Sequence, residues 1–303
     1  MSKLSPLASV SATREVLEKF GLATKKSFGQ HFLINDGVVS RICELAELSE
    51  RDTVLEVGPG IGTLTIALLQ RAGSVVAIER DADLPAVLAE TCSDYENFSL
   101  IEKDALDLEE QDLSVLNAGK GLAPNKFVAN LPYAVAATLI LDYFEKLSFL
   151  ESATIMIQSE VADRICAKPG TKAYGAYTVK LSLYTQVSNR FSVGPQNFFP
   201  PPRVDSAVIR LDRVKPVNQD GQPLDQDTLY AAALMADAAF ATRRKTILNS
   251  CKTHFALLGE RGEVLQEHIH QILDEGGVGE RVRGESLSRE DFLRLGQIAA
   301  RYL

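Results

Sequence analysis

The sequence has few cysteines and no long apolar run. The four cysteines stand far apart without a CxxC pair, which argues against a disulfide framework or a zinc site: Cys43, Cys92, Cys166 and Cys251. No segment approaches the roughly 18 uninterrupted apolar residues that a membrane span requires. The first ten residues hold serines, a lysine and a proline in place of an apolar signal core. We therefore expect a cytoplasmic protein with no membrane partner.

Positive charge is scarce in the middle of the chain. The net charge is −8, and residues 31–157 hold 8 Lys and Arg against 21 Asp and Glu. The flanks are basic, because residues 1–30 hold 5 basic against 2 acidic side chains and residues 158–215 hold 9 against 4. This asymmetry favours a protein that applies particular surfaces to nucleic acid. Ordinary solvated surface charge explains the composition equally well.

Short apolar stretches alternate regularly with amphipathic segments along the first half of the chain. This βαβ pattern predicts an α/β fold, a Rossmann-like doubly wound sheet with its site at the carboxyl ends of the strands. The expected strands are 53–57, 75–78, 100–101, 127–129 and 153–157, and the expected helices are 13–21, 64–71 and 84–89.

A polar, turn-rich stretch over residues 214–222 separates the sheet region from a helical tail. The length of 303 residues exceeds one typical domain. Ser288 and Asp291 are spaced as a capping box at the start of the last helix. We therefore expect a first domain of residues 1–213 and a small helical domain of residues 214–303. The expected helices of the tail are 229–250, 262–274 and 288–303.

A glycine-rich turn follows the strand expected over residues 53–57 and reads Glu56-Val57-Gly58-Pro59-Gly60-Ile61-Gly62. The sixth position of a GxGxxG fingerprint would be Thr63, which departs from the pattern of NAD-binding proteins. Close approach of the backbone at Gly58 and Gly60 suits a nucleoside, and nothing in the turn demands a pyrophosphate.

Acidic residues end the next two strands. Glu79 ends the second strand, where one carboxylate can accept from both hydroxyls of a ribose. Asp104 follows the third strand, where a carboxylate can accept from the amino group of an adenine. A surface acid at a strand end explains either residue alone, but it is a poor explanation for both together.

The tetrapeptide Asn130-Leu131-Pro132-Tyr133 follows an apolar strand. It supplies a side-chain carbonyl, a main-chain carbonyl and an aromatic ring within four residues. An exocyclic amine conjugated to a purine is a poor nucleophile, so its enzyme should accept both N–H hydrogens and stack the ring while the electrophile is brought in line. A strand that ends at a proline-containing turn is the ordinary structural explanation.

Together with the glycine turn and this tetrapeptide, three further segments make the sequence resemble the KsgA-type ribosomal RNA adenine dimethyltransferases. These segments are Phe28-Gly29-Gln30-His31-Phe32-Leu33, Lys172-Ala173-Tyr174-Gly175 and Phe198-Phe199-Pro200-Pro201-Pro202-Arg203-Val204-Asp205-Ser206. The resemblance covers about residues 25–250. It implies a methyltransferase sheet and transfer of methyl groups from S-adenosylmethionine to two adjacent adenines near the 3′ end of 16S rRNA, on a nearly assembled small ribosomal subunit.

The resemblance also implies roles for individual residues. Asn130, Leu131 and Tyr133 match the family's positions that hold the target base, and Phe198 matches an aromatic residue on the other side of that base. His31 stands where many family members carry Asn. The positions that match cofactor contacts of the family are His31, Leu33, Gly58, Glu79, Asp104 and Asn130.

Basic residues beside these motifs predict an RNA-facing rim. The candidates are Lys25, Lys26, Lys172, Arg203, Arg243, Arg244 and Lys245. The last three fall inside the helix expected over 229–250, so at most two of them should reach one phosphate backbone. His268 and His270 do not predict a metal site, because side chains two residues apart do not share a helix face.

Three other functions stay open at the level of the sequence. An antibiotic-resistance methylase of large-subunit RNA shares the glycine turn and the tetrapeptide, but such enzymes tend to be basic and this chain is acidic. A mainly non-catalytic assembly factor on the same fold is compatible with the motifs, although the intact Asn130–Tyr133 segment favours activity. A dehydrogenase would need a hydride-transfer site, which the sequence does not offer. We expect a monomer.

Overall fold

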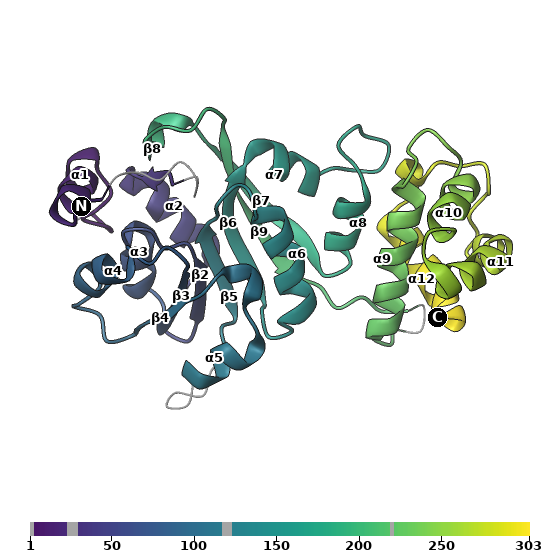
Figure 1. The fold of residues 1–303 in the computed structure, drawn as a ribbon, viewed down its shortest axis with the longest axis horizontal. Coiled ribbons are helices and arrows are strands. Elements are labelled where there is room, and N and C mark those ends of the chain that lie inside the picture. Colours follow the sequence, from purple (N-terminus) through teal and green to yellow (C-terminus); the bar gives the residue numbers. More distant parts are fainter. Residues whose placement is uncertain (1–2, 23–29, 117–122, 219–220) are drawn as a thin grey trace. The chain divides into compact units, whose positions relative to one another are not determined.

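The computed structural model describes residues 3–22, 30–116, 123–218 and 221–303. A seven-stranded sheet with the order β4-β3-β2-β5-β6-β9-β7 dominates the first part of the chain (Figure 1). Its strands are β2 (Thr53–Val57), β3 (Ser74–Glu79), β4 (Phe98–Glu102), β5 (Lys126–Asn130), β6 (Ser152–Gln158), β7 (Thr185–Val193) and β9 (Ser206–Arg213).

The central strands are parallel and the strand order reverses between β2 and β5. β2 pairs in parallel with β3 on one side and with β5 on the other. All five residues of β2 are buried, as expected for a parallel strand covered on both faces. In such sheets ligands bind outside the carboxyl ends of the strands at the point of reversal. The predicted α/β doubly wound fold is confirmed.

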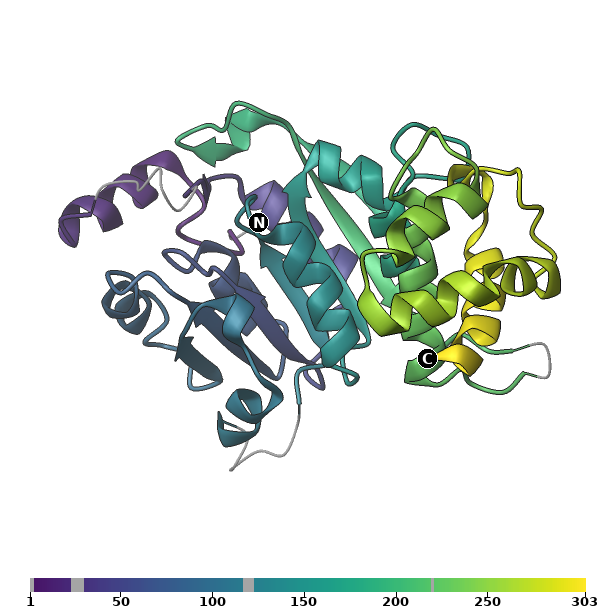
Figure 2. The ribbon, with the colours of Figure 1, turned by 45° about the vertical axis from the view of Figure 1, so that its right-hand side comes forward.

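Helices cover both faces of this sheet. Figures 1 and 2 show α6 against one face and α2 against the other. The side chain of Asn35 caps α2 by accepting from the amide of Gly37 at 2.9 Å, so this helix has a defined start. The helices of this part are α1 (Val10–Lys19), α2 (Asp36–Ala46), α3 (Thr63–Leu69), α4 (Pro85–Thr91), α5 (Glu110–Leu116), α6 (Ala136–Lys146) and α7 (Ser159–Ile165).

Most expected elements appear within three residues of their predicted ends. The antiparallel strands were not anticipated: β9 pairs with β6 from Ser152↔Asp212 to Gln158↔Ser206. A small two-stranded sheet was also missed. Its strands, β1 (Phe32–Leu33) and β8 (Phe198–Phe199), are antiparallel and bring two segments of the family resemblance side by side.

The C-terminal part is helical, as predicted, but one expected helix is two. The chain leaves α9 at Phe240 and enters α10 at Ile247, so the continuous helix expected over 229–250 is wrong. The hydroxyl of Ser250 donates to the carbonyl of Ala238 at 2.7 Å and accepts from the amide of Thr242, which stabilises the turn between them. The helices of this part are α9 (Gln226–Phe240), α10 (Ile247–Phe255), α11 (Gly259–Glu275) and α12 (Arg289–Ala299), and α8 (Ala176–Ser182) lies before β7 in the chain.

The expected capping box begins the last of these helices. Ser288 accepts from the amide of Asp291 at 3.2 Å, and the Asp291 carboxylate accepts from the amide of Ser288 at 2.7 Å. Short 3-10 helices complete the described secondary structure: η2 (Ala105–Asp107), η3 (Pro195–Asn197), η4 (Gly284–Ser286) and η5 (Ala300–Tyr302). Among the described helices, none is long and apolar enough to cross a membrane.

The chain divides into two compact units. The first, called the sheet unit, contains Met1–Ala162 and Val187–Arg213. The second, called the helical unit, contains Asp163–Gln186 and Val214–Leu303. The second unit therefore takes in a segment that the boundary expected at residue 214 assigns to the first domain. That each part is a domain in its own right stays a prediction.

Candidate active site

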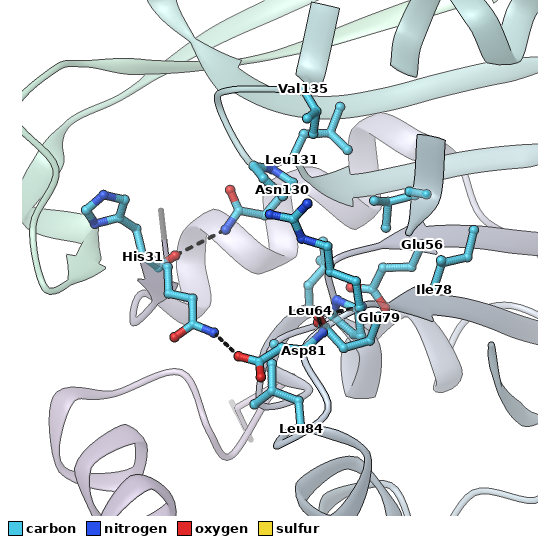
Figure 3. A pocket seen from close by; sticks show the side chains of 18 of the residues that line it. His31, Glu56, Leu64, Ile78, Glu79, Asp81, Leu84, Asn130, Leu131 and Val135 are labelled. Carbon is cyan, nitrogen blue, oxygen red and sulfur yellow. Dashed lines mark hydrogen bonds between the residues drawn. The ribbon is translucent and has the colours of Figure 1, made fainter. Parts of the chain in front are cut away.

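A cavity of about 500 Å³ opens at the carboxyl ends of β2, β3 and β5 (Figure 3). This volume lies within the roughly 300–1,000 Å³ typical of small-molecule sites. The position is the one that the reversal of strand order predicts. Among the residues that line it are the expected positions His31, Leu33, Gly58, Gly60, Glu79, Asp104, Asn130, Leu131 and Tyr133.

The glycine turn forms a cradle without side chains. Gly58 has φ +69° and Gly60 has φ +60°, both in the left-handed region that favours glycine. A Cβ atom on Gly60 would lie 3.2 Å from the ring of Phe32, and one on Gly58 would lie 3.6 Å from Pro132. The backbone of the turn therefore favours glycine at both positions, and close approach of a ligand to this backbone stays a prediction.

Glu79 ends β3 at the wall of the cavity and is 8% exposed. One carboxylate oxygen accepts from the backbone amides of Arg80 and Asp81, each at 2.9 Å. Burial raises the pKa of the carboxyl, and these backbone hydrogen bonds oppose the rise. The hydrogen bonds fix the orientation of an acid that can accept from hydroxyl donors in the cavity.

Asp104 lies at the same edge of the sheet, but its oxygens already have partners. One accepts from the amide of Leu106 at 3.0 Å and caps η2, and the other accepts from the Arg80 guanidinium at 2.9 Å. The hydrogen bond from Leu106, with the Arg80 side chain, holds the pKa of this carboxyl below its usual range. Asp104 is thus ionised at neutral pH, and a ligand amino group would share it with Arg80.

Asn130 is oriented by a backbone contact. Its side-chain nitrogen donates to the carbonyl of His31 at 3.3 Å (Figure 3). This contact uses the amide nitrogen and leaves the amide oxygen to accept from a ligand. Leu131 is 2% exposed, and its own amide donates to Met156 at 3.1 Å, which fixes the main chain beside Asn130.

Tyr133 is half-buried at the lip of the cavity. Its hydroxyl lies 2.7 Å from the hydroxyl of Ser206, and burial raises the pKa of the phenol. The ring of His31 stacks on it, with centroids 6.0 Å apart and planes 28° from parallel. The position of the ring is therefore fixed at both its edge and its face.

Phe198 is not brought to the cavity. It is 2% exposed and belongs to the apolar core with Leu33, Val193 and Val208, because β8 turns this side chain inward. In this conformation the ring offers no open face to a base. Its neighbour Phe199 is partly exposed and has the Arg14 guanidinium 5.0 Å from its ring centroid.

Glu56 is a lining residue that sequence reasoning did not single out. The side chain is 1% exposed, and one of its oxygens has no hydrogen-bond partner among the described residues. Burial raises the pKa of this carboxyl to about 8. Glu56 is the first residue of the glycine-rich motif, and an acidic residue inside an otherwise apolar strand was the one available signal.

A family model described as ribosomal RNA adenine dimethylase matches residues 21–299. The chain belongs to this family. Two relatives are named "Ribosomal RNA small subunit methyltransferase A". The one from Geobacillus sp. (strain WCH70) is 38% identical over 95% of this chain and 96% of its own length. The one from Clostridium botulinum (strain Langeland) is 39% identical over 93% and 96%, respectively.

Solved structures agree with this assignment. A dimethyladenosine transferase from Plasmodium falciparum shares the fold, with a TM-score of 0.71 at 24% identity over 88% of this chain and 96% of that chain. The 23S rRNA methyltransferase ErmE has a TM-score of 0.61 at 29% identity over 88% of this chain and 98% of its own. This member of the dimethylase family is accordingly a methyltransferase.

The expected basic rim of this family member is only partly described. Lys25 and Lys26 lie outside the described residues. Arg203, in the sheet unit, is exposed, and Lys172 is exposed in the helical unit. These placements leave the role of each in RNA binding a prediction.

The run Arg243-Arg244-Lys245 lies in the turn between α9 and α10, so the helical spread expected for it is wrong. Arg243 donates to the carbonyls of Lys172 and Tyr174 at 2.9 and 3.0 Å and lies 3.5 Å from Glu285. It therefore holds the loop at residues 172–174 within the helical unit. Arg244 and Lys245 are exposed, without an ion pair to any described residue.

Proposed function

We propose that this protein transfers methyl groups from S-adenosylmethionine to the exocyclic amines of two adjacent adenines near the 3′ end of 16S rRNA, late in the assembly of the small ribosomal subunit. The observation that carries the proposal is one cavity with two ends. Glu79, Asp104 and the glycine turn lie at the carboxyl ends of β3, β4 and β2 and form one end, and Asn130 with Tyr133 lies at the carboxyl end of β5 and forms the other. The names of the two curated relatives support the small subunit as the substrate.

The residues at the first end fit S-adenosylmethionine. Glu79 would accept from the ribose hydroxyls and Asp104 from the adenine amino group, while Gly58 and Gly60 admit the ligand to the backbone. Several carboxylates around one cavity also favour a ligand with positive charge. When bound, this cofactor supplies a methyl group activated by a sulfonium.

The residues at the second end fit an adenine that carries a free amine. The Asn130 oxygen and the Leu131 carbonyl would accept the two N–H hydrogens and hold the nitrogen lone pair toward the methyl donor. Tyr133 would stack the base, which contributes about 1–3 kcal/mol per base. The base must first leave its RNA stack, which costs a few kcal/mol and is easiest in a loop. The amine becomes acidic on alkylation, so a strong base is not needed.

The proposed ribosomal substrate supports a cytoplasmic location, and we propose that the protein acts there as a monomer. The test compares labelled methyl transfer to unmethylated small-subunit particles with transfer to free large-subunit RNA. The proposal predicts label in the particles and none above background in the large-subunit RNA. Label only in the large-subunit RNA would instead support a methylase of the ErmE kind.

Binding without turnover on either RNA would support an assembly factor. The matched control is Asn130→Ala, which removes the proposed amine contact and leaves Glu79, Asp104 and the glycine turn unchanged. Binding of labelled cofactor by this variant shows that the protein in the assay is folded.

A further inference from the structure

The imidazole of His31 is directed away from the cofactor end of the cavity. In Figure 3 the His31 ring lies on one side of Asn130 and Glu79 lies on the other. The side chain is therefore badly placed to contact a ribose or an adenine of the cofactor. The backbone of His31 also contacts Asn130, through the carbonyl that accepts from the side-chain nitrogen.

The ring makes two contacts with the base-holding end. The Nδ1 atom lies 2.7 Å from the carbonyl oxygen of Pro200, in the loop that follows β8. A carbonyl can only accept, so Nδ1 carries the proton and donates. The face of the ring stacks on Tyr133, with centroids 6.0 Å apart.

These contacts connect His31 to three residues: Asn130, Tyr133 and Pro200. Through its carbonyl His31 orients Asn130, through its ring face it holds Tyr133, and through Nδ1 it fixes Pro200. All four residues belong to the sheet unit. An asparagine in place of His31 could supply the backbone carbonyl and a donor, but it has no ring to support Tyr133.

We propose that the His31 imidazole is a positioning residue for the target base: it fixes Tyr133 against the Pro200 loop and so sets the geometry in which the amine meets Asn130. This proposal rests on the proposed function. It assigns the side chain of His31 to the end of the cavity that holds the base. His31 touches neither reacting atom and acts through Tyr133 and Pro200.

The test measures cofactor affinity by calorimetry and single-turnover methyl transfer to small-subunit particles for three variants. His31→Ala loses both ring contacts, so the transfer rate should fall about tenfold or more while cofactor affinity changes less than about twofold. His31→Phe keeps a ring without the donor, and His31→Asn keeps a donor without the ring. Each should recover part of the lost rate.

His268→Ala is the matched control. His268 also has Nδ1 near a backbone carbonyl, that of Val264 at 2.9 Å, and its ring also stacks on a tyrosine, Tyr302, at 4.2 Å between centroids. It lies in the helical unit, far along the chain from the site. His268→Ala should lower the melting temperature about as much as His31→Ala does. It should leave the transfer rate per folded molecule unchanged.

Two outcomes would overturn the inference. One is a transfer rate for His31→Ala equal to that of the wild type. The other is a loss of cofactor affinity as large as the loss of rate, which would place the side chain at the cofactor end. If the wild-type protein itself fails to methylate the particles, the proposed function fails instead, so the two failures are distinguishable.

Discussion

For single residues, the chemical type and the position at a strand end were enough to predict which side chains line the cavity. The contacts between those side chains could not be predicted. Glu79, Asp104 and Asn130 line one cavity because parallel strands end at the same edge of the sheet. The ion pair between Arg80 and Asp104 could not be predicted, since it depends on the pairing of β3 with β4. The burial of Phe198 was missed for a similar reason, because the direction of its side chain is set by pairing with Leu33.

Replacing Glu79 by Ala should weaken cofactor binding. The loss of two hydrogen bonds to a charged acceptor costs about 1.5–3 kcal/mol, so the dissociation constant should rise roughly tenfold or more. Isothermal calorimetry measures it. Asp94→Ala, which removes an exposed acid of the same unit, is the control and should bind as the wild type does. Unchanged affinity in Glu79→Ala would remove this residue from the site.

Asn130→Ala should separate binding from chemistry. The side-chain oxygen is proposed to hold the reacting amine, so turnover should fall at least a hundredfold, about 2.7 kcal/mol in barrier height. Affinity for the cofactor should stay within a few-fold, because the main chain at this position is unchanged. Comparable losses in both measurements would show that Asn130 serves the cofactor alone.

The buried Glu56 predicts a pH dependence of stability. Burial raises its pKa from 4.5 to about 8, so the folded state binds a proton that the unfolded state has released between these values. The free energy of unfolding should therefore fall as pH rises through this window, by at most about 1.4 kcal/mol per pH unit. Urea unfolding of the wild type and of Glu56→Gln at several pH values checks this. The free energy of unfolding of Glu56→Gln should fall less steeply with rising pH than that of the wild type. Parallel profiles for both proteins would contradict the prediction.

At the scale of the element, hydrophobic periodicity located most helices and strands but not the break between α9 and α10. Apolar spacing continues through residues 229–250, whereas the break depends on a hydroxyl contact between Ser250 and Ala238 and on Thr246, which caps α10. Such contacts between neighbouring turns leave no periodic signal. Because of this turn, the three basic residues at 243–245 have different roles. Arg243 hydrogen-bonds the loop at residues 172–174, whereas Arg244 and Lys245 are exposed.

The variant Arg244→Ala with Lys245→Ala should lower the slope of log affinity against log salt by about 1–2 for small-subunit particles, at about 0.7–0.9 per lost phosphate contact. Cofactor affinity should not change. Arg243→Ala, in contrast, should act mainly by lowering the melting temperature, because its guanidinium hydrogen-bonds two backbone carbonyls. A salt slope unaffected by the double change would mean that these two side chains are ordinary solvated surface.

At the scale of the whole molecule, the sequence predicted the α/β class and the family, because both depend on motifs that are continuous in the chain. The antiparallel β9 and the contacts of residues 163–186 with the helical unit were not predicted, since they depend on long-range pairing. The acidic middle of the chain also gains an explanation. Four of its acidic residues, Glu56, Glu79, Asp81 and Asp104, line the cavity, where they would favour the proposed cationic cofactor.

The most direct test of the account identifies the product. Purified protein, S-adenosylmethionine and unmethylated small-subunit particles are incubated together, and the 16S rRNA is digested and analysed by mass spectrometry. We expect two adjacent adenosines near the 3′ end, each carrying two methyl groups on its exocyclic nitrogen. Methylation of another nucleoside or another atom, or no methylation by protein that binds the cofactor, would contradict it.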